Sequence, residues 1–182
     1  MSAAPPRFPA PRMKRLVLAT CLAALLVVSA APASAAPILS VVPSSPNVTV
    51  GGVFTVDFLL SGVTDLYAFQ FGIGYDPNVL TAFTVTQGAF LSTAGSTSFF
   101  PGFIDNNLGF ISFNANALVG PIAGASGSGT LLSVTFGAFA LGTSAITAIF
   151  DPVLGDGLYD SLFAPIPLGA INNGTITVAP VS

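Results

Sequence analysis

The sequence predicts an all-β fold, an antiparallel β-sandwich of about nine strands with jelly-roll topology. Short runs of apolar residues alternate with small or polar ones, as in strands that bury one face. Gly, Asn, Asp or Pro residues interrupt these runs roughly every ten residues, and these residue types favour turns. No stretch repeats apolar residues with a helical period of about 3.6 over several turns, so little helix is expected.

The first strands are expected at residues 38–42 and 48–50, followed by longer ones at 54–60 and 68–75. In the two longer strands every second residue is bulky and apolar, which directs one set of side chains toward the core. The inward set consists of Phe54, Val56, Phe58, Leu60, Phe69, Phe71, Ile73 and Tyr75. The other face of the strand at 68–75 is nearly bare, with Ala68, Gln70, Gly72 and Gly74.

Further strands are expected at residues 80–86, 111–116, 131–138, 144–150 and 175–178. In the strand at 111–116, alternation assigns Ile111, Phe113 and Ala115 to the core. It assigns Ser112, Asn114 and Asn116 to the solvent. Turns are expected at 76–78 and 105–109, where Asp and Asn gather, and a flexible loop is expected at Gly124–Gly129.

Charged residues are few and unevenly placed. All four Lys and Arg residues lie within the first fifteen positions, all seven acids are Asp beyond residue 50, and the chain has no His. Because phosphate recognition depends on Arg and Lys, nucleic acid and nucleotides are excluded as ligands of the mature chain. The same stretch lacks a His base, a Lys amine and a Cys nucleophile, so the protein is not expected to be an enzyme.

Residues 1–35 read as a secretory signal peptide. Lys14 and Arg15 form its positive region, residues 16–28 its apolar stretch, and the small residues ending at Ala35 its cleavage site. Met13 is the expected true start. The apolar stretch is shorter than the roughly 20 residues that span a bilayer, so no membrane span is expected in the mature chain. The mature domain is therefore expected to cover residues 36–182 and to be secreted.

Several stretches resemble the cohesin-type domain of secreted bacterial proteins. They are SGVTDLYAFQFGIGYDPNVL, QGAFLSTAGSTSFFPGFIDNNLGFISFNANAL, GSGTLLSVTFGAFALGTSAI and NNGTITV. The resemblance runs from about residue 38 to 178, and it implies a nine-stranded jelly-roll sandwich that shares its fold class with several carbohydrate-binding modules.

The resemblance implies binding without catalysis, since the best-known cohesins dock dockerin modules that carry their own calcium. It places the docking face on the sheet containing residues 68–71, where Ala68 and Gln70 stand at positions that often carry Asn and Asp. With Asn114 and Asn116 on the next strand, these residues are the candidate partner-binding set. The expected role is docking of a dockerin-like protein, or assembly of extracellular material linked to polysaccharide handling.

Two other constellations predict ligand sites. Asp151, Asp156 and Asp160, with Asn172 and Asn173, offer the oxygen ligands that calcium prefers, although their spacing is not that of a helix-loop-helix calcium loop. No other cofactor is expected. Tyr67 and Tyr159 are candidate platforms for stacking against a polysaccharide, whereas alternation directs Tyr75 to the core.

Two alternatives to protein docking stay open. One is a carbohydrate-binding module that uses Tyr67 and Tyr159. The other is a self-associating structural protein, because Phe99, Phe100 and Phe103 lie between strands and either form an exposed apolar surface or cap the open end of the sandwich. A surface with acids and no cations is expected to keep copies apart at low salt and to let them approach at high salt.

Overall fold

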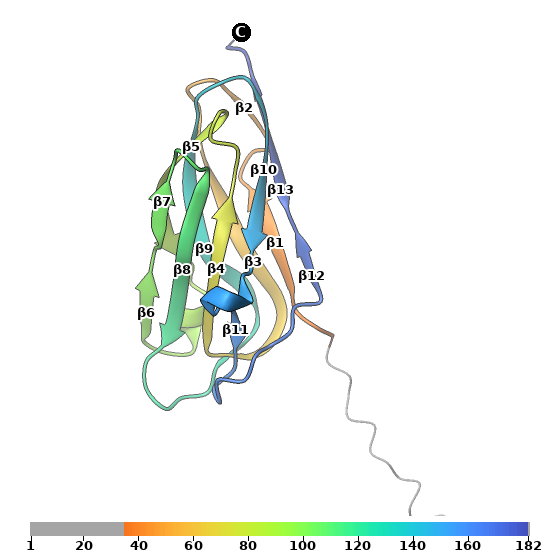
Figure 1. Cartoon of the computed structure of the whole chain (residues 1–182). Helices are drawn as coiled ribbons and strands as arrows, with labels where there is room; N and C mark the ends of the chain where they lie inside the picture. The colour runs from red at the N-terminus through yellow and green to blue at the C-terminus, as the bar shows by residue number, and fades with distance from the viewer. Residues whose placement is uncertain (1–34, 182) are drawn as a thin grey trace, which may run out of the picture. The chain divides into compact units, whose positions relative to one another are not determined.

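The computed structural model describes residues 35–181, and these residues fold into two β-sheets packed face to face (Figure 1). Within residues 35–181, helix is limited to two single 3-10 turns, η1 (Leu91–Thr93) and η2 (Pro152–Leu154). The strands of the described residues are β1 (Ile38–Pro43), β2 (Asn47–Thr49), β3 (Val53–Leu66), β4 (Ala68–Gly74), β5 (Leu80–Gln87), β6 (Thr97–Phe100), β7 (Phe103–Asp105), β8 (Phe110–Leu118), β9 (Ala125–Ala138), β10 (Gly142–Ile149), β11 (Gly157–Tyr159), β12 (Ala170–Asn172) and β13 (Gly174–Ala179).

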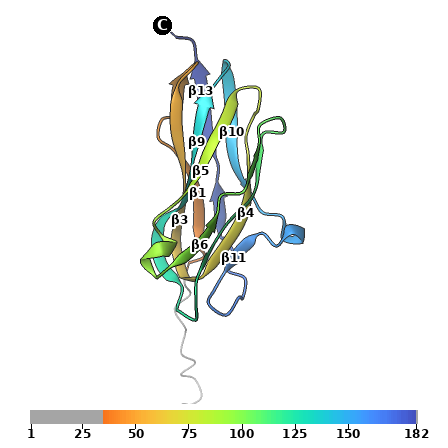
Figure 2. The ribbon, with the colours of Figure 1, turned by 90° about the vertical axis from the view of Figure 1, so that its left-hand side faces the viewer.

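One sheet has five strands in the order β12-β1-β3-β9-β5. The other has eight, with β2-β13-β10-β4-β8-β6 in line, β11 beside β4 and β7 beside β8. Pairing is antiparallel except at β1–β12 and β2–β13. In Figure 2 the segment with η2 and β11 stands out from the body of the sandwich.

The predicted sandwich is confirmed, but the described residues form thirteen strands instead of about nine. The four strands that were not predicted, β6, β7, β11 and β12, are three or four residues long. Runs this short contain too few alternating residues to separate a strand from a loop.

The prediction of a flexible loop at Gly124–Gly129 is wrong, because β9 begins at Ala125 and pairs there with the end of β3. Register shifts interrupt this part of the ladder. The serine hydroxyls replace part of the missing pairing: Ser126 Oγ accepts a hydrogen bond from the amide of Asp65, and Ser128 Oγ accepts one from Gly62, both at 3.0 Å. Side chains thus stabilise the Gly- and Ser-rich beginning of β9, which contains no large apolar residue before Leu131.

The core lies between the two sheets and is rich in aromatic rings. All eight predicted inward residues of β3, β4 and the adjoining Tyr75 are buried, which confirms the alternation. Phe71 is central, with its ring centroid 5.5 Å from that of Phe58 and 5.4 Å from that of Phe150. In the described part of the chain, all buried hydrophobic residues lie between Leu39 and Val178. None of the helices in residues 35–181 is long and apolar enough to cross a membrane.

Alternation fails in β8, where the prediction of outward Asn114 and Asn116 is wrong. Phe113 adopts a left-handed backbone with φ of 56°, and a bulge sets Asn114 opposite Phe71 and Ile111 opposite Ile73. The extra residue reverses the two faces beyond it. Asn114 and Asn116 are therefore 0% and 2% exposed, whereas Phe113 is 38% exposed.

The two buried asparagines are bonded differently. Nδ2 of Asn114 donates hydrogen bonds to the carbonyl oxygens of Phe71 and Ile111, at 3.0 and 3.1 Å, and so holds the bulge together. Among the described residues, neither the Nδ2 nor the Oδ1 atom of Asn116 has a hydrogen-bond partner. A buried polar group without a partner lowers stability, whereas an apolar side chain of similar size does not carry this cost.

Leucine in place of Asn114 or Asn116 is expected to change the stability of the domain in opposite directions. Asn116→Leu should raise the free energy of unfolding by about 1 kcal/mol, because it removes unpartnered polar atoms. Asn114→Leu should lower it by about 2 kcal/mol or more, because two buried carbonyl groups lose their donor. Urea unfolding of both variants measures this, and a shift of the same sign in both would contradict the bonding described.

Candidate functional site

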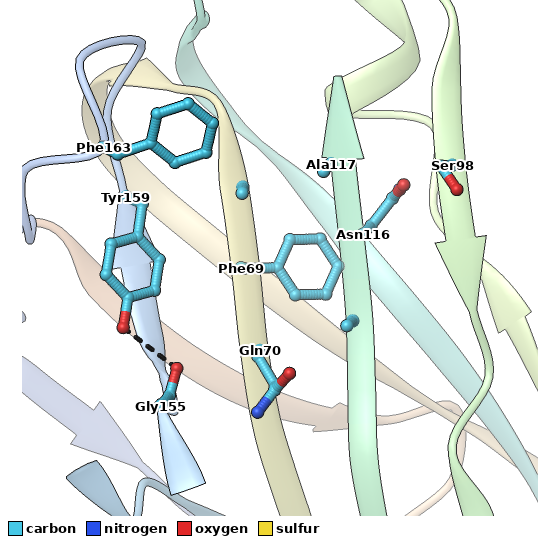
Figure 3. Close-up of a pocket in the computed structure, with 10 residues that line it drawn as sticks. Phe69, Gln70, Ser98, Asn116, Ala117, Gly155, Tyr159 and Phe163 are labelled. Atoms are coloured by element: carbon cyan, nitrogen blue, oxygen red, sulfur yellow. Dashed lines mark hydrogen bonds between the residues drawn. The ribbon is translucent and has the colours of Figure 1, made fainter. Parts of the chain in front are cut away.

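A shallow apolar hollow of about 390 Å³ lies on the outer face of the eight-stranded sheet, over β11, β4, β8 and β6 (Figure 3). Its floor consists of small residues, Ala68 on β4 and Ala115 and Ala117 on β8, with Ser98 on β6 beside them. Tyr159 and Phe163 stand along one side of it. The nearly bare face predicted for β4 is thus the start of a concave surface.

Strand register explains why the floor is made of small residues. Ala117 lies opposite both Ala68 and Ser98, and Ala115 lies opposite Gln70. Cross-strand neighbours share a face, so the β8 alanines point outward with Ala68. The bulge at Phe113 produces this arrangement, since unbroken alternation would have directed Ala115 inward and the asparagines outward.

Gln70 points outward, as predicted, but its amide is already engaged. Its Nε2 atom donates hydrogen bonds to the carbonyl oxygen of Leu154 and to Oδ1 of Asp156, each at 3.0 Å. Gln70 therefore ties the β10–β11 segment to the sheet at the margin of the hollow. Of the predicted partner-binding residues, the structure brings Ala68 and Gln70 to this surface and buries the side chains of Asn114 and Asn116 beneath it.

The two candidate platform tyrosines differ in exposure. Tyr67 is only 9% exposed, its hydroxyl donates to the carbonyl oxygen of Gly120 at 2.8 Å, and its ring lies edge-on to Phe163 with centroids 5.3 Å apart. It supports Phe163 and does not present a free ring face, which corrects its prediction as a platform. Tyr159 is half-buried in the wall of the hollow, and its hydroxyl donates to the carbonyl oxygen of Gly155 at 2.9 Å.

The acids predicted to bind calcium do not converge. Asp151 caps η2 by accepting from the amide of Val153, Asp156 accepts from the amide of Asp151 and from Gln70, and Asp160 accepts from the amides of Leu162 and Ala164. Asn172 lies on β12 in the other sheet. Within residues 35–181, no three acidic, His or Cys side chains gather as a metal site would require.

Asp65 joins two loops beside the hollow. Its carboxylate accepts from the hydroxyl of Ser161 and the amide of Gly124, both at 2.6 Å, and from the amide of Ser161 at 3.3 Å. The Ser161 hydroxyl and, next, the Gly124 amide hold the pKa of Asp65 below its ordinary value of 3.8, because they stabilise the charged form. The carboxylate thereby links the end of β3 to both the β8–β9 and the β11–β12 loops.

This contact is expected to weaken in acid. Since the folded pKa of Asp65 lies below the unfolded one, the stability it contributes is complete above about pH 4 and is lost as the pH falls through the folded pKa. The stability advantage of the wild type over Asp65→Asn should therefore shrink from pH 7 to about pH 2. Urea unfolding across this range measures it, and an NMR titration of the Asp65 carboxyl carbon with a midpoint at or above 3.8 would contradict the contacts.

Two further apolar areas are exposed. Phe100 and Phe103 are 44% and 64% exposed and pack edge-on against each other, while Phe99 packs against the core. Phe100 and Phe103 thus form an exposed apolar surface, whereas Phe99 does not take part in it. A second hollow, of about 380 Å³, lies by β3, β5 and β9, where Val53, Phe83 and Phe139 are exposed.

Comparison with known proteins places this sandwich in a family. The family model described as Cohesin domain matches residues 39–178. Among curated protein sequences, none matches this chain. Among solved structures, a type II cohesin domain from the cellulosome of Acetivibrio cellulolyticus is 18% identical over 78% of this chain and 95% of its own, with a TM-score of 0.62.

Two more structures are similar in the same way. A type II Cohesin-X-Dockerin complex from Acetivibrio cellulolyticus contains a chain that is 16% identical, with 79% of this chain and 99% of that chain covered and a TM-score of 0.64. A non-cellulosomal cohesin from the archaeon Archaeoglobus fulgidus is 19% identical, with 80% and 92% covered and a TM-score of 0.58. At these identities the structures support the fold alone.

Proposed function

This chain belongs to the cohesin domain family, and from that premise we propose that it docks a dockerin-type protein on the outer face of its eight-stranded sheet. Cohesin domains are non-catalytic protein-docking modules. The observation that carries the proposal is the apolar hollow floored by Ala68, Ala115 and Ala117. An open apolar surface with a small-residue floor admits the side chains of a protein partner and offers few polar groups to orient a small substrate.

The surroundings of the hollow suit a protein interface. Two exposed apolar residues lie beside it. Phe163, on the β11–β12 loop, is 67% exposed, and Phe100, on β6 opposite Ala115 of β8, is 44% exposed. Gln70 and the β10–β11 segment provide a polar margin. An apolar centre inside a polar rim is the usual arrangement of a specific protein interface.

The signal-like sequence of residues 1–35 agrees with the same role. We propose that residues 1–35, which lie almost wholly outside the described part, act as a secretory signal and that residues 36–182 meet their partner outside the cell. The partner would then belong to extracellular machinery linked to polysaccharide handling. Calcium enters this proposal through the dockerin, whose Asp and Asn loops supply oxygen ligands.

The direct test uses residues 36–182 as bait against the individually purified dockerin modules of the producing organism. At least one module should bind in calcium with a Kd of about 1 μM or below and should be released by EDTA. Binding by none of them in calcium would overturn the dockerin assignment. Retention on a polysaccharide array without any dockerin would instead support the carbohydrate-binding alternative, for which Tyr159 is the remaining candidate platform.

One observation favours self-association as a second candidate. The exposed Val53, Phe83 and Phe139 form an apolar area on the opposite sheet, away from the proposed docking face. All charged side chains beyond residue 15 are acidic, so copies repel one another less as salt screens their charge. Sedimentation at low and high salt tests this, since dimers that appear only at high salt and vanish in Phe83→Ser would establish it.

A further inference from the structure

The strained backbone positions of the domain gather around the hollow. Among residues 35–181, only three residues other than glycine have a left-handed backbone: Asp65, Phe113 and Phe163, with φ of 60°, 56° and 60°. For a bulky residue this conformation is costly and is found mainly where function requires it. Phe113 creates the bulge that exposes the alanine floor, Asp65 holds the β11–β12 loop, and Phe163 lies in that loop.

Phe163 is held in place although it is exposed. Phe163 is 67% exposed and lines the hollow, while its ring makes a T-shaped contact with the ring of the buried Tyr67. Figure 3 shows it beside Tyr159, with both rings on the other side of β4 from Ala117. An exposed phenylalanine that is already positioned loses little conformational freedom when a partner covers it.

The loop is fastened on both sides of Phe163. Oδ1 of Asp160 accepts from the amides of Leu162 and Ala164, at 2.9 and 2.8 Å, and the amide of Phe163 donates to the carbonyl oxygen of Asp160 at 2.9 Å. Ser161 is bound through its amide and hydroxyl to Asp65. We call Asp65, Asp160 and Ser161 the clasp. It keeps Phe163 in its left-handed conformation.

We propose that Phe163 is a preset aromatic anchor of the docking face, and that the partner inserts an aliphatic side chain between this ring and the floor formed by Ala68 and Ala117, with Lys or Arg beside it. The proposal rests on the proposed docking function and names the partner's chemistry. Small alanines leave room for a branched side chain, and aromatic anchors in such pockets dominate binding energy.

Lys or Arg is expected on the partner because the charged residues around the hollow are acidic. The end of β3 and the loops beside the hollow carry Asp65, Asp151, Asp156 and Asp160, and the described residues contain no Lys, Arg or His. A partner with Lys or Arg at the rim meets complementary charge, which speeds association and makes it sensitive to salt. A partner with acidic residues at the rim is repelled.

The experiment uses a yeast-displayed library built on a dockerin module with its helix-surface positions randomised, selected in calcium against residues 36–182. Selected modules should be enriched in Leu, Ile or Val at one position and in Lys or Arg near it. Their affinity should fall about tenfold or more for Phe163→Asn and remain within about twofold for Leu162→Ala. Leu162 is the matched control, because it is adjacent, 84% exposed and outside the hollow.

Phe163→Asn also separates binding from folding. Asparagine tolerates the left-handed backbone, so this variant should be at least as stable as the wild type in thermal unfolding although it binds less tightly. Selected modules that bind Phe163→Asn as well as the wild type would overturn the anchor and leave the docking function standing. A library that yields no binder at all would overturn the docking function, and the anchor with it.

The clasp has its own readout, which needs no partner. Ser161→Ala removes the hydroxyl that binds Asp65 without changing a left-handed residue, whereas Ser161→Thr keeps a hydroxyl. In NMR spectra the contact between the rings of Phe163 and Tyr67 should weaken in Ser161→Ala and persist in Ser161→Thr, and affinity for the selected modules should follow. Ring contact and affinity unchanged in Ser161→Ala would show that the clasp does not position Phe163.

Discussion

Replacing Ala117 by arginine should weaken docking about 100-fold or more and leave the domain folded. Ala117 lies in the floor of the hollow between Ala68 and Ser98, on the outer side of β8. An arginine there fills the space above both neighbours and adds a positive charge where the partner carries its own. We expect the affinity for a cognate dockerin module to fall at least 100-fold, or by about 3 kcal/mol, in isothermal titration calorimetry.

The matched control is Ala145→Arg. Ala145 is an exposed residue on β10 of the same sheet and lies outside the hollow, so this variant adds the same charge to the same kind of strand. Its affinity for the dockerin module should stay within about threefold of that of the wild type, because residues outside the centre of an interface contribute little to binding. Equal losses in both variants would mean that net charge, and not the alanine floor, controls association.

Removing the ring of Phe71 should have the largest effect on stability. Phe71 is fully buried on β4, and its ring contacts those of Phe58, Phe69 and Phe150. Phe71→Ala leaves a cavity between the sheets at the point where both meet. The free energy of unfolding should fall by about 3–5 kcal/mol, and the thermal midpoint by roughly 10 °C.

Phe103→Ala is the control for Phe71→Ala, because it also removes an aromatic ring from the eight-stranded sheet. Phe103 is 64% exposed and contacts the ring of Phe100, so its truncation should cost less than about 1 kcal/mol. Differential scanning calorimetry of both variants measures the contrast. A Phe71→Ala variant that unfolds within a few degrees of the wild type would show that the sheets do not pack through this ring.

Alternation predicts the long strands well and fails where the backbone departs from a regular ladder. In β3 and β4 the pattern of bulky residues fully determines which face is buried, because register is fixed by the core. In β8 a bulge at Phe113 reverses the pattern, and no residue type near it signals a left-handed backbone. Asn114 and Asn116 were therefore assigned to the wrong face.

The surface is predictable only in part, since it combines segments that are distant in sequence. The nearly bare face of Ala68 and Gln70 follows from alternation in a single strand. The hollow also needs Ala117 from β8 and Phe163 from a loop that is held by Asp65, about a hundred residues earlier in the chain. The pair Leu162-Phe163 after a turn-forming Asp was the one local signal, because apolar residues are unusual in an exposed turn.

The same reasoning explains why the calcium prediction fails on geometry. Asp151, Asp156 and Asp160 lie close together in sequence, but each carboxylate is used to hold backbone amides of its own turn. Asp is common in turns for this reason. Spacing alone does not show whether acids converge on one point, and here they stabilise the two loops that border the hollow.

Alanine-methyl NMR of residues 36–182, titrated with a cognate dockerin module, tests the docking face most directly. The methyl groups of Ala68, Ala115 and Ala117 should shift or broaden on binding, because they form the floor of the hollow. The methyl signals of Ala145, which is exposed on β10, and of Ala82, which is buried in the core, should not change. Perturbation of Ala145 with an unchanged floor would contradict the assignment of the docking surface.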